Sequence, residues 1–180
     1  MSAFSPSRPR VLISTDALRQ RVAELAAEIQ HDYRDRERII AVGVLKGSVF
    51  FLSDLLQQID LPISVDFFQT SSYGDQTESD DVRIIKDLDG SVSGAHVLLI
   101  EDIVDTGKTL RTVLDLLKFR RAASVKLCTL LDKQARRQVD VPIHYCGFEI
   151  DDHFVVGYGL DHAGLYRNLP YIGVYEGGGA

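Results

Sequence analysis

The order of apolar and polar residues along the 180-residue chain divides it into segments of two kinds. After Ser14 or Thr15, either of which can cap a helix, apolar residues recur every three or four positions as far as Tyr33. Further along, short continuous apolar runs are typical of strands that are buried on both faces. The chain is therefore expected to form an amphipathic helix first and to alternate strands with helices after it.

Further strands and helices follow from the same pattern. The strands are expected at 39–44, 63–70, 82–86, 97–100, 125–131 and 142–148, and the helices at 49–59 and 108–119. Strands that alternate with helices predict an α/β fold with a twisted, mainly parallel sheet flanked by helices. Ligands bind beyond the carboxyl ends of such strands. The turns after Val44, Ile100 and Leu131 are therefore expected to converge on one crevice.

The domain organisation is expected to be simple. No linker or internal repeat interrupts residues 1–180, and this length suits one domain. Residues 1–10 and 176–180 are predicted to be flexible tails. The segment 71–81 is polar, contains Gly74 and lacks periodicity, so it is predicted to be a mobile loop.

Composition narrows the class of protein. The 26 acidic residues exceed the 20 basic ones, and the net charge of −6 disfavours nonspecific binding to nucleic acid. No apolar run approaches the roughly 20 residues that span a membrane, and the polar N-terminal segment lacks the apolar region of a secretory signal. Cys128 and Cys146 form no CxxC pattern and are expected to be reduced core residues. These features predict a cytoplasmic protein with no membrane contact.

Residues 97–110 carry the most specific chemistry of the chain. An apolar run ends in Glu101 and Asp102, and Asp105 then precedes a Thr-Gly-Lys-Thr turn that opens a helix. Free backbone N–H groups at a helix N-terminus favour phosphate. Carboxylates so close to a phosphate would repel it unless a divalent cation or a ribose diol lies between them. The segment therefore predicts a phosphorylated sugar as ligand.

Two other interpretations of this segment bear on that prediction. Gly107-Lys108-Thr109 imitates the end of a P-loop, but that motif requires glycine at position 102, where the chain has Asp102. A P-loop kinase is thereby disfavoured. An ordinary strand–turn–helix with its acids in solvent is the second interpretation.

The stretch from Glu101 to Thr109 resembles the phosphoribosyl-pyrophosphate (PRPP) signature of the type I phosphoribosyltransferases, in the form found in their hypoxanthine-guanine branch. Two further segments, 44–47 and 154–161, match the family in the same order, and the resemblance covers about residues 11–174. It implies the family's α/β fold with a small hood and a mobile lid loop. It also implies transfer of the phosphoribosyl group from PRPP to hypoxanthine or guanine, with Mg²⁺ as cofactor and a homodimer or homotetramer as assembly.

The resemblance also implies roles for individual residues. Asp105 would act as the general base at purine N7, and Glu101 and Asp102 would hold the ribose hydroxyls, directly or through metal. The residues implied for PRPP and its phosphates are Lys46, Gly47, Ser72, Tyr73, Glu101, Asp102, Asp105, Thr106, Gly107, Lys108, Thr109 and Arg167. In the family the peptide bond before the lysine of the first loop is often cis. The matching bond here is Leu45–Lys46, and its isomer is not visible in a sequence.

The purine is assigned to the second half of the chain. Phe154 would stack on the base, Val155 would offer backbone contacts, and Lys133 would donate to the oxygen at C6 of an oxopurine. Asp161 would lie near the base and the metal, so the implied metal ligands are Glu101, Asp102 and Asp161.

Two alternatives remain open from the sequence. An enzyme of the same fold can act on another base, such as xanthine or adenine. The fold also serves in RNA-binding regulators of pyrimidine operons. The acidic net charge and the three carboxylates at 101, 102 and 105 favour an enzyme over a regulator.

Overall fold

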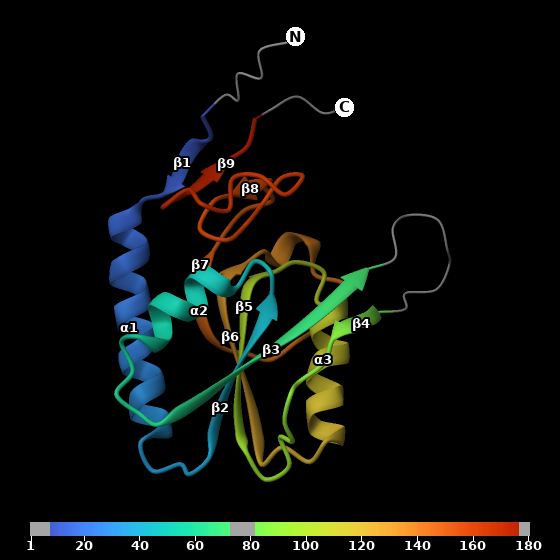
Figure 1. Cartoon of the computed structure of the whole chain (residues 1–180). Helices are drawn as coiled ribbons and strands as arrows, with labels where there is room; N and C mark the ends of the chain where they lie inside the picture. The colour runs from blue at the N-terminus through green and yellow to red at the C-terminus, as the bar shows by residue number, and fades with distance from the viewer. Residues whose placement is uncertain (1–7, 73–81, 177–180) are drawn as a thin grey trace.

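The computed structural model describes residues 8–72 and 82–176 (Figure 1). Within these ranges the helices are α1 (Thr15–Tyr33), α2 (Val49–Leu56) and α3 (Lys108–Phe119), with a short 3-10 helix, η1, at Gln134–Arg136. The strands are β1 (Arg10–Ile13), β2 (Ile39–Leu45), β3 (Ile63–Ser72), β4 (Val82–Lys86), β5 (His96–Val104), β6 (Ser124–Asp132), β7 (Ile143–Glu149), β8 (Val155–Val156) and β9 (Ile172–Val174). Parts of both predicted tails, 1–7 and 177–180, lie outside the described residues.

The central sheet has the strand order β4-β3-β2-β5-β6-β7. Five of these strands run parallel to one another, namely β3, β2, β5, β6 and β7. Strand β4, at the edge, pairs antiparallel with β3. The mainly parallel sheet expected from the alternation of strands and helices is confirmed. Strand β3 extends to Ser72, beyond the predicted end at residue 70, because Ser71 and Ser72 pair with Arg83 and Val82 of β4.

Helices cover both faces of this sheet, which explains the continuous apolar run in β5. Leu98 and Ile100 contribute to one core cluster with side chains of α1 and α2, whereas Val97 and Leu99 contribute to a second cluster with side chains of α3. Successive strand residues point to opposite faces, so a strand with two buried faces must be apolar at every position. Figure 1 shows α1 and α2 on one side of the sheet and α3 on the other.

A separate three-stranded sheet, here called the hood, has the order β1-β9-β8 (Figure 1). Arg10 pairs with Val174, and Val155 of β8 pairs with the same residue from the other side. The prediction of a tail as far as residue 10 is therefore wrong for Arg10, which begins β1. A four-residue strand whose partner lies at the opposite end of the chain leaves no local signal in the sequence.

Candidate active site

The carboxyl ends of β2, β5 and β6 meet at one edge of the central sheet. Strand β2 pairs with β5 on one side, and β5 pairs with β6 on the other, with Val104 opposite Asp132. The backbone N–H of Lys133 donates to the carbonyl of Val104 at 3.0 Å, which holds the end of β6 against the end of β5. The three turns therefore lie at the same edge of the sheet, as predicted.

Glu101 and Asp102 are buried at this edge, with exposed fractions of 8% and 9%. Asp102 Oδ1 accepts from the backbone N–H of Ile103 at 2.8 Å, and Glu101 Oε1 accepts from the N–H of Asp102 at 3.2 Å. Burial, and then the neighbouring charge of Asp102, raise the pKa of the Glu101 carboxyl well above its ordinary value. Two adjacent buried carboxyl groups therefore form a site that a cation would stabilise.

The loop after β2 fits closely around these acids. The Leu45–Lys46 peptide bond is cis, and Lys46 is exposed. A Cβ atom at Gly47 would overlap the carboxylate of Asp102, and one at Gly159 would overlap the carbonyl oxygen of Gly47. Glycine is therefore the residue that allows the loop, the acid and the 154–161 segment to touch.

The turn before α3 is held in place from outside the helix. Gly107 has φ +83°, and the Thr106 carbonyl accepts from the backbone N–H groups of Gln138 and Val139, each at 3.0 Å. The turn borders a cavity of about 270 Å³. Its lining includes these predicted PRPP residues: Glu101, Asp102, Asp105, Thr106, Gly107 and Thr109. The cavity is thus lined by helix-terminal backbone at one end and by carboxylates at the other.

A second cavity, of about 280 Å³, adjoins the first. It is lined by all the residues predicted for the purine, Lys133, Phe154, Val155 and Asp161, together with Asp102, Ile103, Asp105, Arg136 and Leu160. Asp105 lines both cavities, and its Oδ1 is buried without a hydrogen-bond partner among the described residues. A buried carboxylate oxygen with no partner at the junction of two cavities is suited to accept a proton from a ligand.

Lys133 and Phe154 enter the second cavity from different elements. Lys133 follows β6 and is only 5% exposed, and its ammonium lies 3.4 Å from the carboxylate of Asp152. Phe154 precedes β8 and is 53% exposed. The ring of His162 stands edge-on to it at 5.5 Å, and Tyr175 lies at 6.1 Å. Two aromatic rings thus pack around Phe154, and about half of its surface stays exposed.

Arg167 and Asp161 form an ion pair beside this cavity. Their Nη2 and Oδ1 atoms are 2.5 Å apart, and the second oxygen of Asp161 accepts from the backbone N–H of Gly164 at 2.7 Å. Arg167 also donates to the carbonyl of Gly159. Gly159 in turn packs against the backbone of Gly47. Both oxygens of Asp161 are therefore engaged within the chain, and its implied role as a metal ligand stays a prediction.

Comparison with known proteins decides the family. Residues 14–163 match the phosphoribosyl transferase domain. The chain belongs to the phosphoribosyltransferase family. It is 52% identical to hypoxanthine phosphoribosyltransferase of Haemophilus influenzae, over 91% of this chain and 93% of that protein, and 50% identical to hypoxanthine-guanine phosphoribosyltransferase of Bacillus subtilis, over 93% of each. A crystal structure of a hypoxanthine phosphoribosyltransferase from Staphylococcus aureus superimposes with a TM-score of 0.88 at 46% identity, covering 93% of this chain and 91% of that one.

A metal in this phosphoribosyltransferase would depend on few protein ligands. Among residues 8–72 and 82–176, no group of three or more His, Cys, Asp or Glu side chains is arranged to hold an ion. Mg²⁺ is commonly bound by one or two carboxylates together with substrate phosphates. The buried pair of Glu101 and Asp102 fits a cation that arrives with a polyphosphate.

Some predicted residues stand apart from the two cavities. Tyr73 and most of the predicted lid loop lie outside the described residues, and Ser72 is placed only as the end of β3. Lys108 is half-buried at the start of α3. The side chains of Lys46 and Arg167 are not part of either cavity lining, so their roles remain untested.

Several residues of the site were missed in the sequence. Arg136 and Leu160 line the second cavity, Thr70 lines the first cavity, and Asp152 pairs with Lys133. Arg136 follows Lys133 in the turn after β6, so its position at the ligand-binding edge of the sheet is a signal that could have found it.

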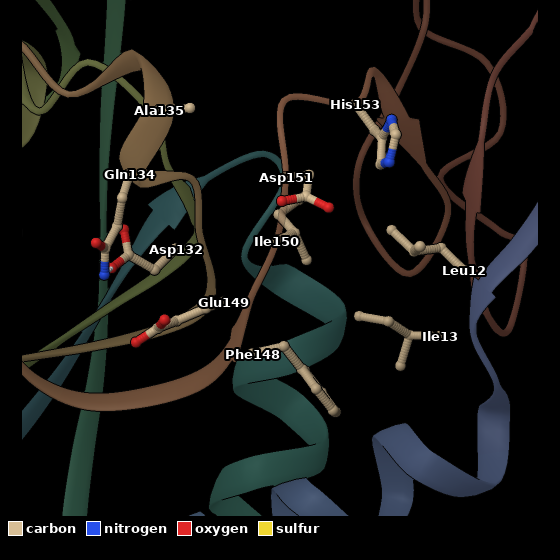
Figure 2. Close-up of a pocket in the computed structure, with 10 residues that line it drawn as sticks. All are labelled: Leu12, Ile13, Asp132, Gln134, Ala135, Phe148, Glu149, Ile150, Asp151 and His153. Carbon is tan, nitrogen blue, oxygen red and sulfur yellow. Dashed lines mark hydrogen bonds between the residues drawn. The ribbon is translucent and has the colours of Figure 1, made fainter.

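A larger cavity, of about 450 Å³, shares no lining residue with these two among the described residues (Figure 2). Figure 2 shows Leu12 and Ile13 of β1 across from Asp132 and Glu149, with Phe148 between them. None of the residues predicted from the sequence for PRPP, the purine or metal lines it. Size alone therefore does not locate the active site.

The part of the chain described contains no helix that is both long and apolar enough to cross a membrane.

Proposed function

We propose that this protein transfers the 5-phosphoribosyl group from PRPP to hypoxanthine or guanine and releases IMP or GMP and pyrophosphate. Such a reaction serves purine salvage. The observation that carries the proposal is the pair of adjoining cavities with Asp105 at their junction. The names of the similar proteins from Haemophilus influenzae and Bacillus subtilis support the same activity.

In this proposal the first cavity, here called the phosphate cavity, binds PRPP. The second, here called the purine cavity, binds the base. The 5′-phosphate would occupy the turn from Asp105 to Thr109, where backbone N–H groups at the start of α3 and threonine hydroxyls can donate to it. The loop of Lys46 and Gly47 would bind the pyrophosphate, with Arg167 nearby, since its guanidinium can donate to two oxygens of such an anion.

Glu101 and Asp102 would hold the ribose hydroxyls, directly or through a Mg²⁺ ion that accompanies the pyrophosphate. When bound, Mg²⁺ neutralises charge on the pyrophosphate leaving group. The contribution of the chain is to place two desolvated carboxyl groups where that cation compensates their burial. Asp161 is proposed as an additional ligand, once its pairing with Arg167 rearranges.

Asp105 is proposed as the general base. As the bond forms between purine N9 and C1′ of the ribose, the base must lose a proton, which the resemblance places at N7. Asp105 lines the purine cavity, and its buried Oδ1 has no hydrogen-bond partner among the described residues. A carboxylate in that position can accept the proton without first breaking another hydrogen bond.

The edge of the purine is proposed to determine which base is used. Stacking on Phe154 does not discriminate, because every purine offers a similar face. The ammonium of Lys133 can donate to the C6 oxygen of hypoxanthine or guanine, whereas adenine presents an amino donor there. A buried donor left unpaired costs about 1–3 kcal/mol, and more if it is charged, so adenine should be rejected.

A spectrophotometric assay with PRPP and Mg²⁺ tests the proposal directly. We expect turnover of hypoxanthine and guanine, and rejection of adenine by a factor on the order of 10⁴ in kcat/KM. Efficient use of adenine would contradict the role of Lys133, and efficient use of xanthine alone would indicate a different base specificity. A gel-shift assay with RNA examines the regulator alternative, for which we expect no binding.

We also propose that the protein works in the cytoplasm as a homodimer or homotetramer, as the family resemblance implies. Ile84 and Ile85 of the edge strand β4 are 41% and 56% exposed, which supports contact with another subunit. Analytical ultracentrifugation determines the assembly, and a monomer at micromolar concentration would contradict it.

A further inference from the structure

Four side chains of alternating charge are linked beside the purine cavity. This charge chain consists of Lys133, Asp152, Arg136 and Asp105. Oδ1 of Asp152 lies 3.4 Å from the ammonium nitrogen of Lys133 and 3.4 Å from Nε of Arg136. Nη1 of Arg136 lies 3.8 Å from Oδ2 of Asp105. Lys133, Arg136 and Asp105 line the cavity, whereas Asp152 is absent from its lining and contacts the two cations.

Lys133 depends on this contact for its orientation. Its side chain is only 7% exposed, and within the described residues Asp152 is the one carboxylate recorded at ion-pair distance from it. A lysine side chain is a flexible stem with a point charge, so a fixed backbone does not by itself fix the ammonium. Asp152 is half-exposed, with 50% of its side chain accessible, so its carboxylate keeps contact with solvent while it compensates a buried cation.

The ends of this charge chain match two neighbouring atoms of an oxopurine. O6 and N7 are adjacent positions on the same edge of an oxopurine. In the proposed function O6 accepts from a donor, and N7 of the free base carries the proton that a carboxylate removes. In the proposed function Lys133 faces O6 and Asp105 faces N7. The spacing between them is therefore the quantity that must be fixed, and the link through Asp152 and Arg136 joins them.

Resting on the proposed function, we propose that Asp152 is a positioning residue for base recognition: through Lys133 and Arg136 it fixes the donor that reads C6 relative to the carboxylate that serves N7. Asp152 touches neither the base nor PRPP. Its loss leaves Lys133 free to turn away from the base and leaves Arg136 with Asp105 as its remaining partner. Both changes weaken recognition of an oxopurine and leave the phosphate cavity intact.

The variant Asp152→Asn preserves shape and removes the charge. We expect KM for hypoxanthine to rise about tenfold to a hundredfold, the effect of misplacing a recognition group by about 1 Å. KM for PRPP should stay within about twofold, because the phosphate cavity does not include this pair. The ratio of kcat/KM for hypoxanthine over adenine should fall by a similar factor of about ten or more.

Asp151→Asn is the matched control, since this neighbouring carboxylate is exposed and forms no ion pair among the described residues. It should behave as the parent protein does. Asp152→Glu restores the charge and should recover most of the base selectivity. In a Lys133→Met background, Asp152→Asn should change the selectivity ratio no further, which a purely structural role does not predict.

The outcomes separate the two proposals. If the parent protein fails to turn over hypoxanthine, the proposed function is wrong. If the parent is active and Asp152→Asn matches Asp151→Asn in base KM and selectivity, the inference about Asp152 is overturned. It is also overturned if KM for PRPP and for hypoxanthine rise together, or if Asp152→Glu is as impaired as Asp152→Asn. Thermal unfolding of each variant verifies that folded proteins are compared.

Discussion

At the scale of single residues, the site is distinguished by polar groups whose burial is only partly compensated within the chain. Among the described residues Asp105 keeps one oxygen without a hydrogen-bond partner, and Glu101 is buried beside another acid. Buried polar groups are normally paired, so such exceptions occur where a ligand completes them. The residues whose burial is least compensated within the chain are therefore the ones with the clearest chemical role.

Asp105→Asn is expected to slow the reaction without loosening PRPP. An amide can still hydrogen-bond but cannot accept a proton, and general base catalysis is worth about 10²–10⁴-fold. We expect kcat to fall by about that factor, while Kd for PRPP by calorimetry changes less than about tenfold. Asp115→Asn, an exposed acid on α3, is the control and should leave kcat unchanged. An unaltered kcat in Asp105→Asn would exclude this carboxylate from the chemical step.

At the scale of elements, backbone conformation shapes the phosphate cavity. Helix α3 begins after Gly107, whose φ of +83° is one that residues with a Cβ adopt only with strain. A Cβ there would also overlap the carbonyl oxygen of Val139. The turn that receives the phosphate is thus fixed against the 138–139 segment.

Gly107→Ala is expected to destabilise the fold and impair PRPP binding together. Forcing a residue with a Cβ into such a conformation costs about 1–3 kcal/mol, and each kcal/mol lowers the melting temperature by about 2–4 °C in a domain of this size. Two control glycines separate the causes by calorimetric unfolding. Gly164→Ala adds strain at φ +80° with no neighbour within 4 Å, and Gly90→Ala adds neither strain nor overlap. Equal melting temperatures for all three variants would contradict the steric argument.

Elements and motifs were predictable where their cause is local. The sequence at 39–44 and 108–119 predicts β2 and α3 correctly. A continuous apolar run indicates a buried strand and a helical period indicates a helix, and both patterns lie within a few consecutive residues. The hood strand β1 was missed because β9, its partner, lies at the far end of the chain. Arg136 and Asp152 were missed for a related reason, since their importance comes from ion pairs between separate loops.

At the scale of the whole molecule, the buried acids link stability to pH and to ligand. Burial, and then the charge of Asp102, raise the pKa of the Glu101 carboxyl above its ordinary value of 4.5, so the folded protein keeps this proton to a higher pH than the unfolded chain does. The native state therefore binds more protons, and stability falls as pH rises from about 4.5 through the folded pKa. Ligand-free protein is thus less stable at neutral pH than its core would otherwise allow.

Glu101→Gln is expected to stabilise the ligand-free protein at pH 7 and to make little difference near pH 4. A gain of about 1 kcal/mol would raise the melting temperature by about 2–4 °C. Calorimetric scans in EDTA across this pH range measure the difference, with the exposed Glu37→Gln as a control that should show none. A lower melting temperature for Glu101→Gln at pH 7 would refute the sign of the effect.

PRPP binding is expected to require a divalent cation. The phosphate cavity is lined by the carboxylates of Glu101, Asp102 and Asp105, and a polyanion would be repelled there unless a cation lies between. Titration calorimetry with PRPP should show tight binding in Mg²⁺ and a loss of at least about tenfold in affinity in EDTA. Similar affinity under both conditions would remove the charge argument.

The central place of β9 in the hood bears on the order of events during synthesis on the ribosome. Strand β9 lies between β1 and β8 in the hood, so neither of these strands can pair until β9 has been synthesised. The six strands of the large sheet are all made by Glu149 and can fold earlier. The strands that surround the phosphate cavity can therefore pair before β9 is made, whereas Val155 of β8 pairs with its neighbour only once β9 is present.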